Sequence, residues 1–242
     1  MRRKKKVNIR MSSRNQRDMT AHQDLSQRYF NDVYVPLNFA AQNPIQRFCR
    51  RFFRTTASSI AVHGIDLLRD VRPKSLLDLG CGTGIFLAEL AAAYPLEQAV
   101  GVDFSQAAIS LAETRLSNRN IFSFERAPVE QCKALRGTYD VVLAIGLFDY
   151  LRFDSMLFEA MLKAARSMVI VTLPRRRFRL QRLARHAWLR MNGVTLCTYM
   201  SPDIERICQS APEAGRFSMR ISHPPDLPDN EWLVCRRLER PA

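Results

Sequence analysis

The stretch that decides the fold is Leu76-Leu77-Asp78-Leu79-Gly80-Cys81-Gly82-Thr83-Gly84. A short apolar run leads into three glycines at alternate positions, and a run of strong helix formers follows at 85–93. A strand, a glycine-rich turn and a helix together bring a ligand against the backbone at a helix N-terminus. Glycine permits this approach because any Cβ would collide with the ligand. We therefore predict a ligand site on residues 78–84, in preference to a tight turn that binds nothing.

An alternation of strands and helices extends from this turn along the chain. Apolar runs predict strands at 75–79, 99–102, 121–125, 140–145 and 168–173, and helices at 85–93, 106–116 (capped by Ser105) and 155–166. Strands that alternate with such helices imply a parallel sheet covered on both faces. The final strands, 217–222 and 231–238, are joined by too few residues for a helical crossover, so we expect them to pair antiparallel. A further helix should begin with Ser201 as its cap.

The flanking regions suggest three parts. Residues 1–20 are polar and basic without apolar periodicity, which predicts a disordered tail. Residues 21–73 should form an N-terminal helical cap, with one helix from Asn43-Pro44 and a second at about 59–69. Residues 74–242 should form the main domain, with a lid inserted at about 174–200.

The insertion is the most individual part of the chain. Its apolar stripe at helical spacing consists of Leu180, Leu183, Ala184, Ala187, Trp188 and Met191, and arginines lie off the stripe. A basic amphipathic helix that carries a tryptophan can lie on a membrane surface. We favour a lid that packs its stripe over a pocket, and contact with an anionic membrane surface stays open as an alternative.

Composition narrows the class of protein. The 242 residues suit one α/β domain, and no apolar run reaches the ~18 residues that cross a bilayer. No signal peptide is expected, because the basic start is not followed by an apolar segment. Six cysteines and four histidines are scattered without metal-ligand spacing, so we predict no metal site and reduced thiols in a cytoplasmic protein. The net charge of +14 raises the question of an anionic partner.

A second motif indicates the kind of ligand. Asp103 ends the second predicted strand, near the spacing of about 20 residues expected for an acid that binds ribose hydroxyls. Phe104 follows and offers a flat wall for a base. The glycines run G-x-G-x-G, whereas a dinucleotide fingerprint requires G-x-G-x-x-G, and no P-loop pattern is present. A nucleotide-like ligand other than NAD or FAD is indicated.

These segments resemble a known family. LLDLGCGTG, GVDFS and YDVVLAIGLFDYL are similar, in order and spacing, to motifs I, II and IV of the class I S-adenosylmethionine-dependent methyltransferases, over roughly residues 74–173. The resemblance implies a Rossmann-like α/β fold with a seven-stranded sheet, mostly parallel with an antiparallel last strand. It also implies S-adenosylmethionine as cofactor.

The resemblance also carries roles to individual positions. The methionine end of the cofactor would be held by Asp78, Gly80, Cys81, Gly82 and Gly84, the ribose by Asp103, the adenine by Phe104, Val129 and Glu130, and the sulfonium by Ile145 and Gly146. Arg126 and Ala127 replace the family's common acidic start of the segment before Val129.

Methyl transfer from a sulfonium is an in-line displacement that mainly requires alignment and the exclusion of water. Asp149 and Tyr150 follow the fourth strand, where relatives place a polar residue facing the acceptor. We predict Asp149 as base or orienting group and Tyr150 as a pocket wall. The alternative is structural, with Asp149 capping a turn and Tyr150 packing under a helix.

The predicted activity is methylation of an oxygen, nitrogen or carbon of a small metabolite. Two alternatives remain. The basic tail favours a nucleic-acid methyltransferase, but the tail lacks interleaved aromatic residues and no N/D-P-P-[YFW] tetrapeptide follows the fourth strand, so nucleic acid is the weaker reading. A non-enzymatic binding module is the third reading, and the intact glycines and Asp103 speak against it. The sequence indicates no oligomeric state.

Overall fold

The computed structural model describes residues 28–34, 57–176, 187, 189–192 and 194–238. The basic tail 1–20, the helix expected from Asn43 and most of the insertion lie outside these ranges. Within them, no helix combines the length and the apolar character needed to cross a membrane.

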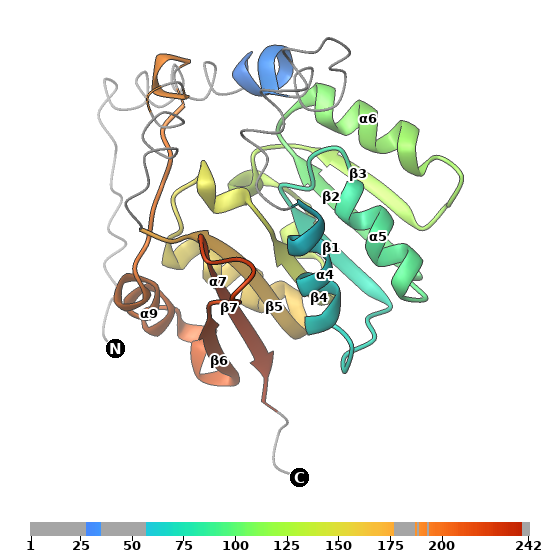
Figure 1. Ribbon diagram of the computed structural model, residues 1–242. Helices are drawn as coiled ribbons and strands as arrows, with labels where there is room; N and C mark the ends of the chain where they lie inside the picture. Colours follow the sequence, from blue (N-terminus) through green and yellow to red (C-terminus); the bar gives the residue numbers. More distant parts are fainter. Residues whose placement is uncertain (1–27, 35–56, 177–186, 188, 193, 239–242) are drawn as a thin grey trace, which may run out of the picture.

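The described chain forms one seven-stranded sheet in the order β3-β2-β1-β4-β5-β7-β6 (Figure 1). The strands are β1 (Ser75–Leu79), β2 (Gln98–Asp103), β3 (Phe122–Arg126), β4 (Tyr139–Ala144), β5 (Ala165–Pro174), β6 (Phe217–Ser222) and β7 (Asn230–Arg237). Strands β1 to β5 pair parallel, and β7 runs antiparallel to both β5 and β6. This confirms the predicted Rossmann-like sheet and the antiparallel pairing of its last strands.

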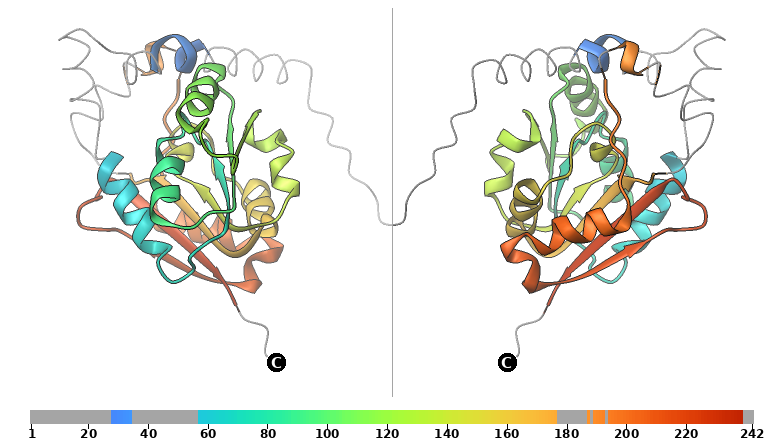
Figure 2. Two further views of the ribbon diagram at one scale, coloured as in Figure 1. Left: turned by 90° about the vertical axis from the view of Figure 1, so that its right-hand side faces the viewer. Right: turned by 90° about the vertical axis from the view of Figure 1, so that its left-hand side faces the viewer.

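Helices cover both faces of the sheet, as Figure 2 shows. On one face, an apolar cluster joins the strands to α5 (Ile85–Ala93), α6 (Gln106–Leu116) and residues in and after α4 (Ala57–Leu67). On the other face, a second cluster joins them to α7 (Ser155–Ala164) and α9 (Ser201–Gln209). Every residue of β1 is buried, because a central parallel strand meets helices on both sides.

The end of α7 and the N-cap of α9 differ from the prediction. The helix expected at 155–166 ends at Ala164, because β5 begins at Ala165 to pair with Tyr139 of β4. Ser201 is not the cap of α9 as predicted, since the N-cap is the extended residue Met200. The Ser201 hydroxyl instead hydrogen-bonds to the buried carboxylate of Glu231 at 3.4 Å.

Glu231 ties the two ends of the insertion to the sheet. Its carboxylate lies 3.3 Å from Arg175 Nε and 2.6 Å from His223 Nδ1, in addition to the contact with Ser201. Arg175 also forms an isolated bridge with Tyr199, so the chain leaves and rejoins the domain at one place. The insertion is therefore anchored at both ends at the edge of β5 and β7.

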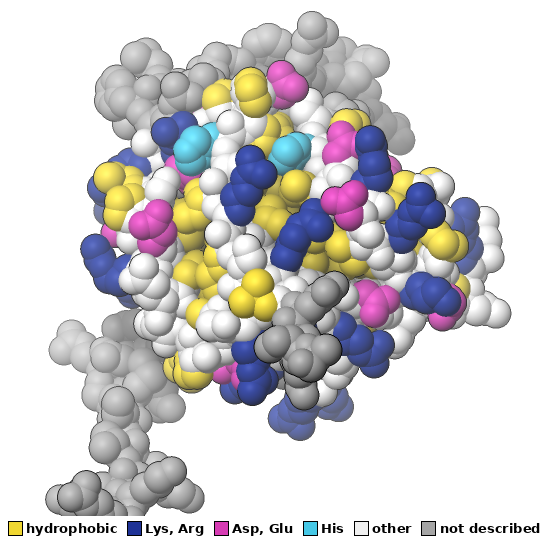
Figure 3. Space-filling view, turned by 90° about the horizontal axis from the view of Figure 1, so that it is seen from below, with side chains coloured by type: hydrophobic (Ala, Val, Ile, Leu, Met, Phe, Trp, Pro, Cys, Tyr) yellow, Lys and Arg dark blue, Asp and Glu magenta, His cyan; other side chains and the backbone are white. Residues whose placement is uncertain are grey.

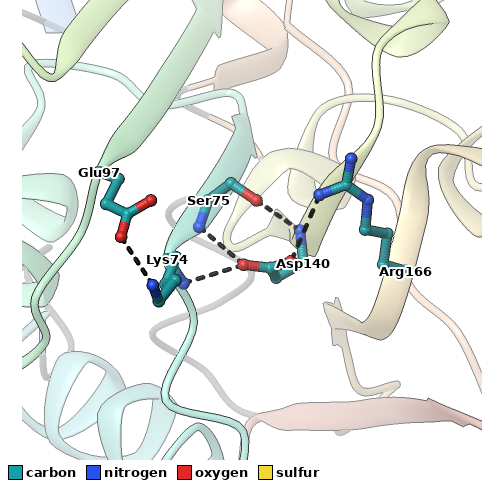
Figure 4. A network of polar contacts seen from close by, with 5 residues as sticks. All are labelled: Lys74, Ser75, Glu97, Asp140 and Arg166. Carbon is teal, nitrogen blue, oxygen red and sulfur yellow. Dashed lines mark hydrogen bonds and ion pairs between the residues drawn. The ribbon is translucent and has the colours of Figure 1, made fainter.

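A polar clamp joins the amino ends of β1 and β4 (Figure 4). The Asp140 carboxylate accepts hydrogen bonds from the backbone N–H groups of Lys74 and Ser75, both at 2.9 Å. In return, the Ser75 hydroxyl accepts one from the Asp140 N–H at 2.8 Å. Burial alone would raise the pKa of Asp140, but these hydrogen bonds and the nearby Arg166 outweigh it and lower the pKa.

We expect Asp140→Ala to lower the free energy of unfolding by about 2 kcal/mol at pH 7, because two backbone donors lose their acceptor. The folded-state pKa is lowered, so this stabilisation is present above the ordinary pKa of aspartate and disappears as the pH falls through the lowered value. Thermal unfolding at pH 7 and near pH 3 measures it. Glu97→Gln, which removes only the exposed ion pair with Lys74, is the control and should change little. An equal loss at both pH values would contradict the assignment.

Candidate active site

The predicted site residues gather at the carboxyl ends of three adjacent strands. Because β1 lies between β2 and β4, the glycine-rich turn after β1 meets Asp103 at the end of β2 and Gly146 after β4. In open α/β sheets, ligands bind beyond this edge, where the strand order reverses. This edge faces the top of Figure 1.

The three glycines of the turn, Gly80, Gly82 and Gly84, have different structural roles. All have positive φ, at 77° for Gly80, 54° for Gly82 and 70° for Gly84. A Cβ on Gly80 would lie 3.1 Å from Leu147 Cδ1, and one on Gly84 would lie 3.1 Å from Ala112 Cβ. A Cβ on Gly82 would meet nothing within 4 Å. Gly80 and Gly84 therefore serve the close packing of the turn, whereas Gly82 borders open space that a ligand can use.

Gly146 repeats this pattern across the crevice. Its φ is 76°, and a Cβ there would also meet nothing within 4 Å. Its N–H donates to Thr172 Oγ1 at 2.8 Å, which fixes the turn after β4 to the buried strand β5. Sequence reasoning missed Thr172, although a single polar residue in the apolar run MVIVTL was a usable signal. Ile145, beside Gly146, is half-buried.

Asp103 supports the glycine-rich turn through hydrogen bonds of its carboxylate. Its carboxylate accepts hydrogen bonds from the Gly82 N–H at 3.0 Å and the Ser105 N–H at 2.8 Å. Burial raises the pKa of Asp103, and the backbone donors partly oppose that rise. The residue predicted to bind ribose therefore also positions the one glycine of the turn that borders open space.

Asp78 lies deeper, on β1, with 2% of its surface exposed. Burial, and secondarily the negative charge of Asp103, raises the pKa of Asp78 to about 7. Burial therefore disfavours the ionised form of both carboxylates, and the charge of Asp103 adds to this effect at Asp78. A cationic group beside them would favour the charged forms, so the site is electrostatically suited to a cation.

Three predicted cofactor residues, Cys81, Val129 and Glu130, are placed less favourably for contact with a ligand. The Cys81 sulfur packs against Gly101, and the Cys81 N–H donates to the Val102 carbonyl at 3.0 Å. Both the thiol and the N–H of Cys81 therefore have partners within the protein. Val129 begins the short helix η2 (Val129–Gln131) with its side chain in the core, and Glu130 is exposed. Their contacts with a cofactor stay predictions.

An aromatic cluster lies beyond the carboxyl ends of the strands and joins segments far apart in sequence. Tyr29 and Phe30, from the helical segment η1 (Tyr29–Tyr34), pack with Leu189 and Val194 of the insertion. The Phe30 ring makes edge contacts with Phe104 at 5.3 Å and Tyr150 at 4.9 Å between centroids. We call Tyr29, Phe30, Leu189 and Val194 the roof cluster. Figure 2 shows both contributing segments beyond the carboxyl ends of the strands, next to α6.

The roof cluster corrects the predicted stripe of the insertion. In its described part, Leu189 is buried at 1% exposure, whereas Ala187 is exposed and Met191 is 78% exposed. Periodicity placed Ala187 and Met191 inside and left Leu189 out. The reason is tertiary, because the apolar partners of Leu189 come from η1, about 160 residues earlier in the chain. Sequence reasoning missed η1, although the aromatic run YFNDVY was a signal.

Asp149 and Tyr150 follow β4 as predicted. Asp149 ends the short helix η4 (Leu147–Asp149), one of its carboxylate oxygens, Oδ1, is shielded from solvent, and its carbonyl accepts from the Cys197 N–H at 2.9 Å. The Tyr199 hydroxyl also holds this loop, by accepting from the Phe153 N–H at 2.8 Å. The end of the insertion thus fixes the loop that carries both predicted catalytic residues. Tyr150 reaches the roof cluster through Phe30.

A family model described as a methyltransferase domain matches residues 46–211. The chain belongs to this family. Among curated proteins, it is 24% identical over 173 residues to a malonyl-[acyl-carrier protein] O-methyltransferase of Legionella pneumophila, covering 71% of this chain and 52% of that protein. It is 29% identical over 98 residues to the rRNA N(6)-adenosine-methyltransferase metl-5 of Caenorhabditis elegans, covering 36% and 45%. The chain spans about half the length of these relatives.

Solved structures of methyltransferases share the fold. Magnesium protoporphyrin IX methyltransferase from Synechocystis PCC 6803, with bound S-adenosylhomocysteine (SAH), superposes with a TM-score of 0.66 at 18% identity, over 89% of this chain and 100% of that one. The plantazolicin methyltransferase BpumL, in complex with a triazolic desmethylPZN analogue and SAH, gives a TM-score of 0.62 at 15% identity, over 94% of this chain and 100% of that one. This degree of likeness establishes the methyltransferase fold of the described chain.

Proposed function

We propose that this chain transfers a methyl group from S-adenosylmethionine to a small-molecule acceptor. One observation carries the proposal: Gly82 and Gly146 border open space, beside two buried carboxylates that favour a cation. A sulfonium cofactor that also carries an ammonium group fits this combination of shape and charge. NAD fits it less well, because its pyrophosphate would meet the carboxylates.

The described residues divide the work of holding the cofactor. Asp78 would pair with the ammonium group, Gly82 would allow the close backbone approach, and Asp103 would accept from the ribose hydroxyls. Phe104 would flank the adenine, and Ile145 and Gly146 would lie beneath the sulfonium. The cofactor, when bound, supplies an already activated methyl group, so the protein chiefly orients the acceptor and excludes water.

For the acceptor, we propose a pocket between the crevice and the loop after β4. Asp149 would act as base or orienting group, and Tyr150 would form a wall. The hydrogen bond from the Cys197 N–H to the Asp149 carbonyl supports this assignment, because it fixes the loop that carries Asp149 and Tyr150. A base is required only if the acceptor atom must lose a proton.

A small acceptor is supported by the roof cluster, which packs apolar side chains against Phe104 and Tyr150, two of the predicted site residues. The match to an rRNA methyltransferase keeps a nucleic-acid acceptor as the second candidate. On the face opposite the site, the described Lys and Arg are dispersed among Asp and Glu (Figure 3), so that face adds no support for a nucleic-acid partner. Exposed Arg190 and Met191 would allow the insertion to touch an anionic membrane surface.

The five described cysteines are free thiols, in keeping with a cytoplasmic location.

Calorimetry tests the central proposal. We expect the protein to bind S-adenosylmethionine and SAH in the micromolar range and to show no heat with NAD. The reason is the glycine spacing together with the paired carboxylates. Tight NAD binding, or no heat with either sulfur compound, would overturn the proposal.

Asp103→Ala should weaken SAH binding by about 1.5–3 kcal/mol, because charge-assisted hydrogen bonds to the ribose are lost. It should also lower the melting temperature, because the Gly82 and Ser105 N–H groups lose their acceptor. Asp140→Ala is the matched control, since Asp140 also accepts from two backbone N–H groups but at the opposite end of the strands. The control should lose stability alone. Equal SAH affinity in the two variants would remove Asp103 from the ribose site.

A further inference from the structure

The segment η1 is held over the site by a side chain that no motif predicted. Asn31 Oδ1 accepts hydrogen bonds from the Ser105 hydroxyl at 2.6 Å and the Ala107 N–H at 3.3 Å. Ser105 in turn caps α6 by accepting from the Ala108 N–H at 3.2 Å. Asn31 and Ser105 thus share the capping of one helix N-terminus, so the position of η1 is tied to the residue two places after Asp103.

Phe30 contacts aromatic residues that follow two different strands. Phe104 follows β2 and Tyr150 follows the end of β4, and β1 separates these strands in the sheet. Strands two positions apart are ~10 Å apart, which one ring can bridge when it contacts both sides. The centroid distances of 5.3 Å and 4.9 Å show that Phe30 makes this bridge. The Phe30 ring therefore joins side chains that follow the two strands on either side of β1.

We infer that Phe30 is a positioning residue that closes the cofactor crevice and forms a wall shared by the cofactor and acceptor pockets, with Asn31 as the anchor that holds it there. Leu189 and Val194 support the ring from the insertion side. This inference rests on the proposed function. Its consequence is that release of the product SAH requires η1 to leave the N-terminus of α6.

Four variants test the inference by the rate of SAH dissociation. Phe30→Ala should speed dissociation by about tenfold, since two aromatic contacts are lost, and Phe30→Leu should restore much of the slow rate. Asn31→Ala should speed it by roughly three- to tenfold, the range expected for lost hydrogen bonds. Asp32→Ala, at an exposed position in the same segment, is the control and should match the wild type.

Hydrogen exchange of the ligand-free proteins adds a readout that does not depend on the cofactor. Asn31→Ala should speed exchange in residues 29–34 relative to Asp32→Ala, while the melting temperatures stay close. If the wild type binds no SAH, the proposed function fails, and the inference fails with it. If the wild type binds SAH and the Phe30 and Asn31 variants release it at the control rate, the inference alone is wrong. Tighter binding by Phe30→Ala would also overturn it, because Phe30 would then occupy the place of the cofactor.

Discussion

Asp78→Asn should make the ligand-free protein more stable at pH 8 and at the same time abolish most of its affinity for SAH. Burial, together with the charge of Asp103, raises the pKa of Asp78 in the folded protein to about 7. At pH 8 the folded wild type must carry a buried charge that the unfolded chain carries at no such cost. An asparagine of the same shape removes that charge, and we expect a gain on the order of 2–4 kcal/mol.

The stability difference between Asp78→Asn and the wild type should depend on pH. For a carboxyl with a raised folded-state pKa, stability is highest below the unfolded pKa of about 4 and falls as the pH rises to the folded value. The difference between Asp78→Asn and the wild type should therefore be small near pH 4, grow up to about pH 7 and then level off. Thermal unfolding without ligand across pH 4–8 measures it. A variant that is less stable than the wild type at pH 8 would contradict the buried charge.

The affinity for SAH should depend on pH in the opposite direction to the stability. A cationic group of the ligand favours the ionised carboxylate, so SAH affinity of the wild type should rise with pH up to about pH 7. Asp78→Asn should bind roughly 10–100-fold more weakly, because a charge-assisted hydrogen bond is lost, and with less pH dependence. Calorimetry at pH 6, 7 and 8 compares the two proteins. Unchanged affinity would remove Asp78 from the cofactor site.

Asp149→Asn should reduce single-turnover methyl transfer by roughly 10²–10⁴-fold if Asp149 acts as a base. The substitution keeps the size of the side chain and leaves the backbone contact with Cys197 in place, so SAH affinity and melting temperature should barely change. Rate and melting temperature are measured on the same sample. The methyl acceptor must first be found by screening small molecules with labelled cofactor.

Asp154→Ala is the control for this test, because alanine removes the oxygen that caps the helix whereas asparagine would keep it. Asp154 lies in the same loop and caps α7 by accepting from the Met156 and Leu157 N–H groups, both at 2.9 Å. It should lose stability and retain its rate per folded molecule. If Asp149→Asn shows that same signature, Asp149 supports the turn and the site has no named base.

Much of the sheet could be predicted because its signals are local. The bounds of α5 and β6 match the prediction to the residue, and Ser105 caps α6 as expected. Apolar runs, capping residues and short connections act between near neighbours in the chain, and a single sequence records them. The prediction failed where a distant partner intervened, as when Glu231 engaged the Ser201 hydroxyl.

The sequence alone determined the family, the parallel sheet and the set of residues at its carboxyl edge, because the glycine spacing and Asp103 lie in consecutive strand–helix units. Only the tertiary structure decided which glycines face open space, since that depends on what packs against each missing Cβ. It also decided that Asp103 supports the turn, that Leu189 rather than Met191 is buried, and that Phe30 contacts both Phe104 and Tyr150. These facts arise from contacts between residues up to about 160 positions apart, which no local pattern can encode.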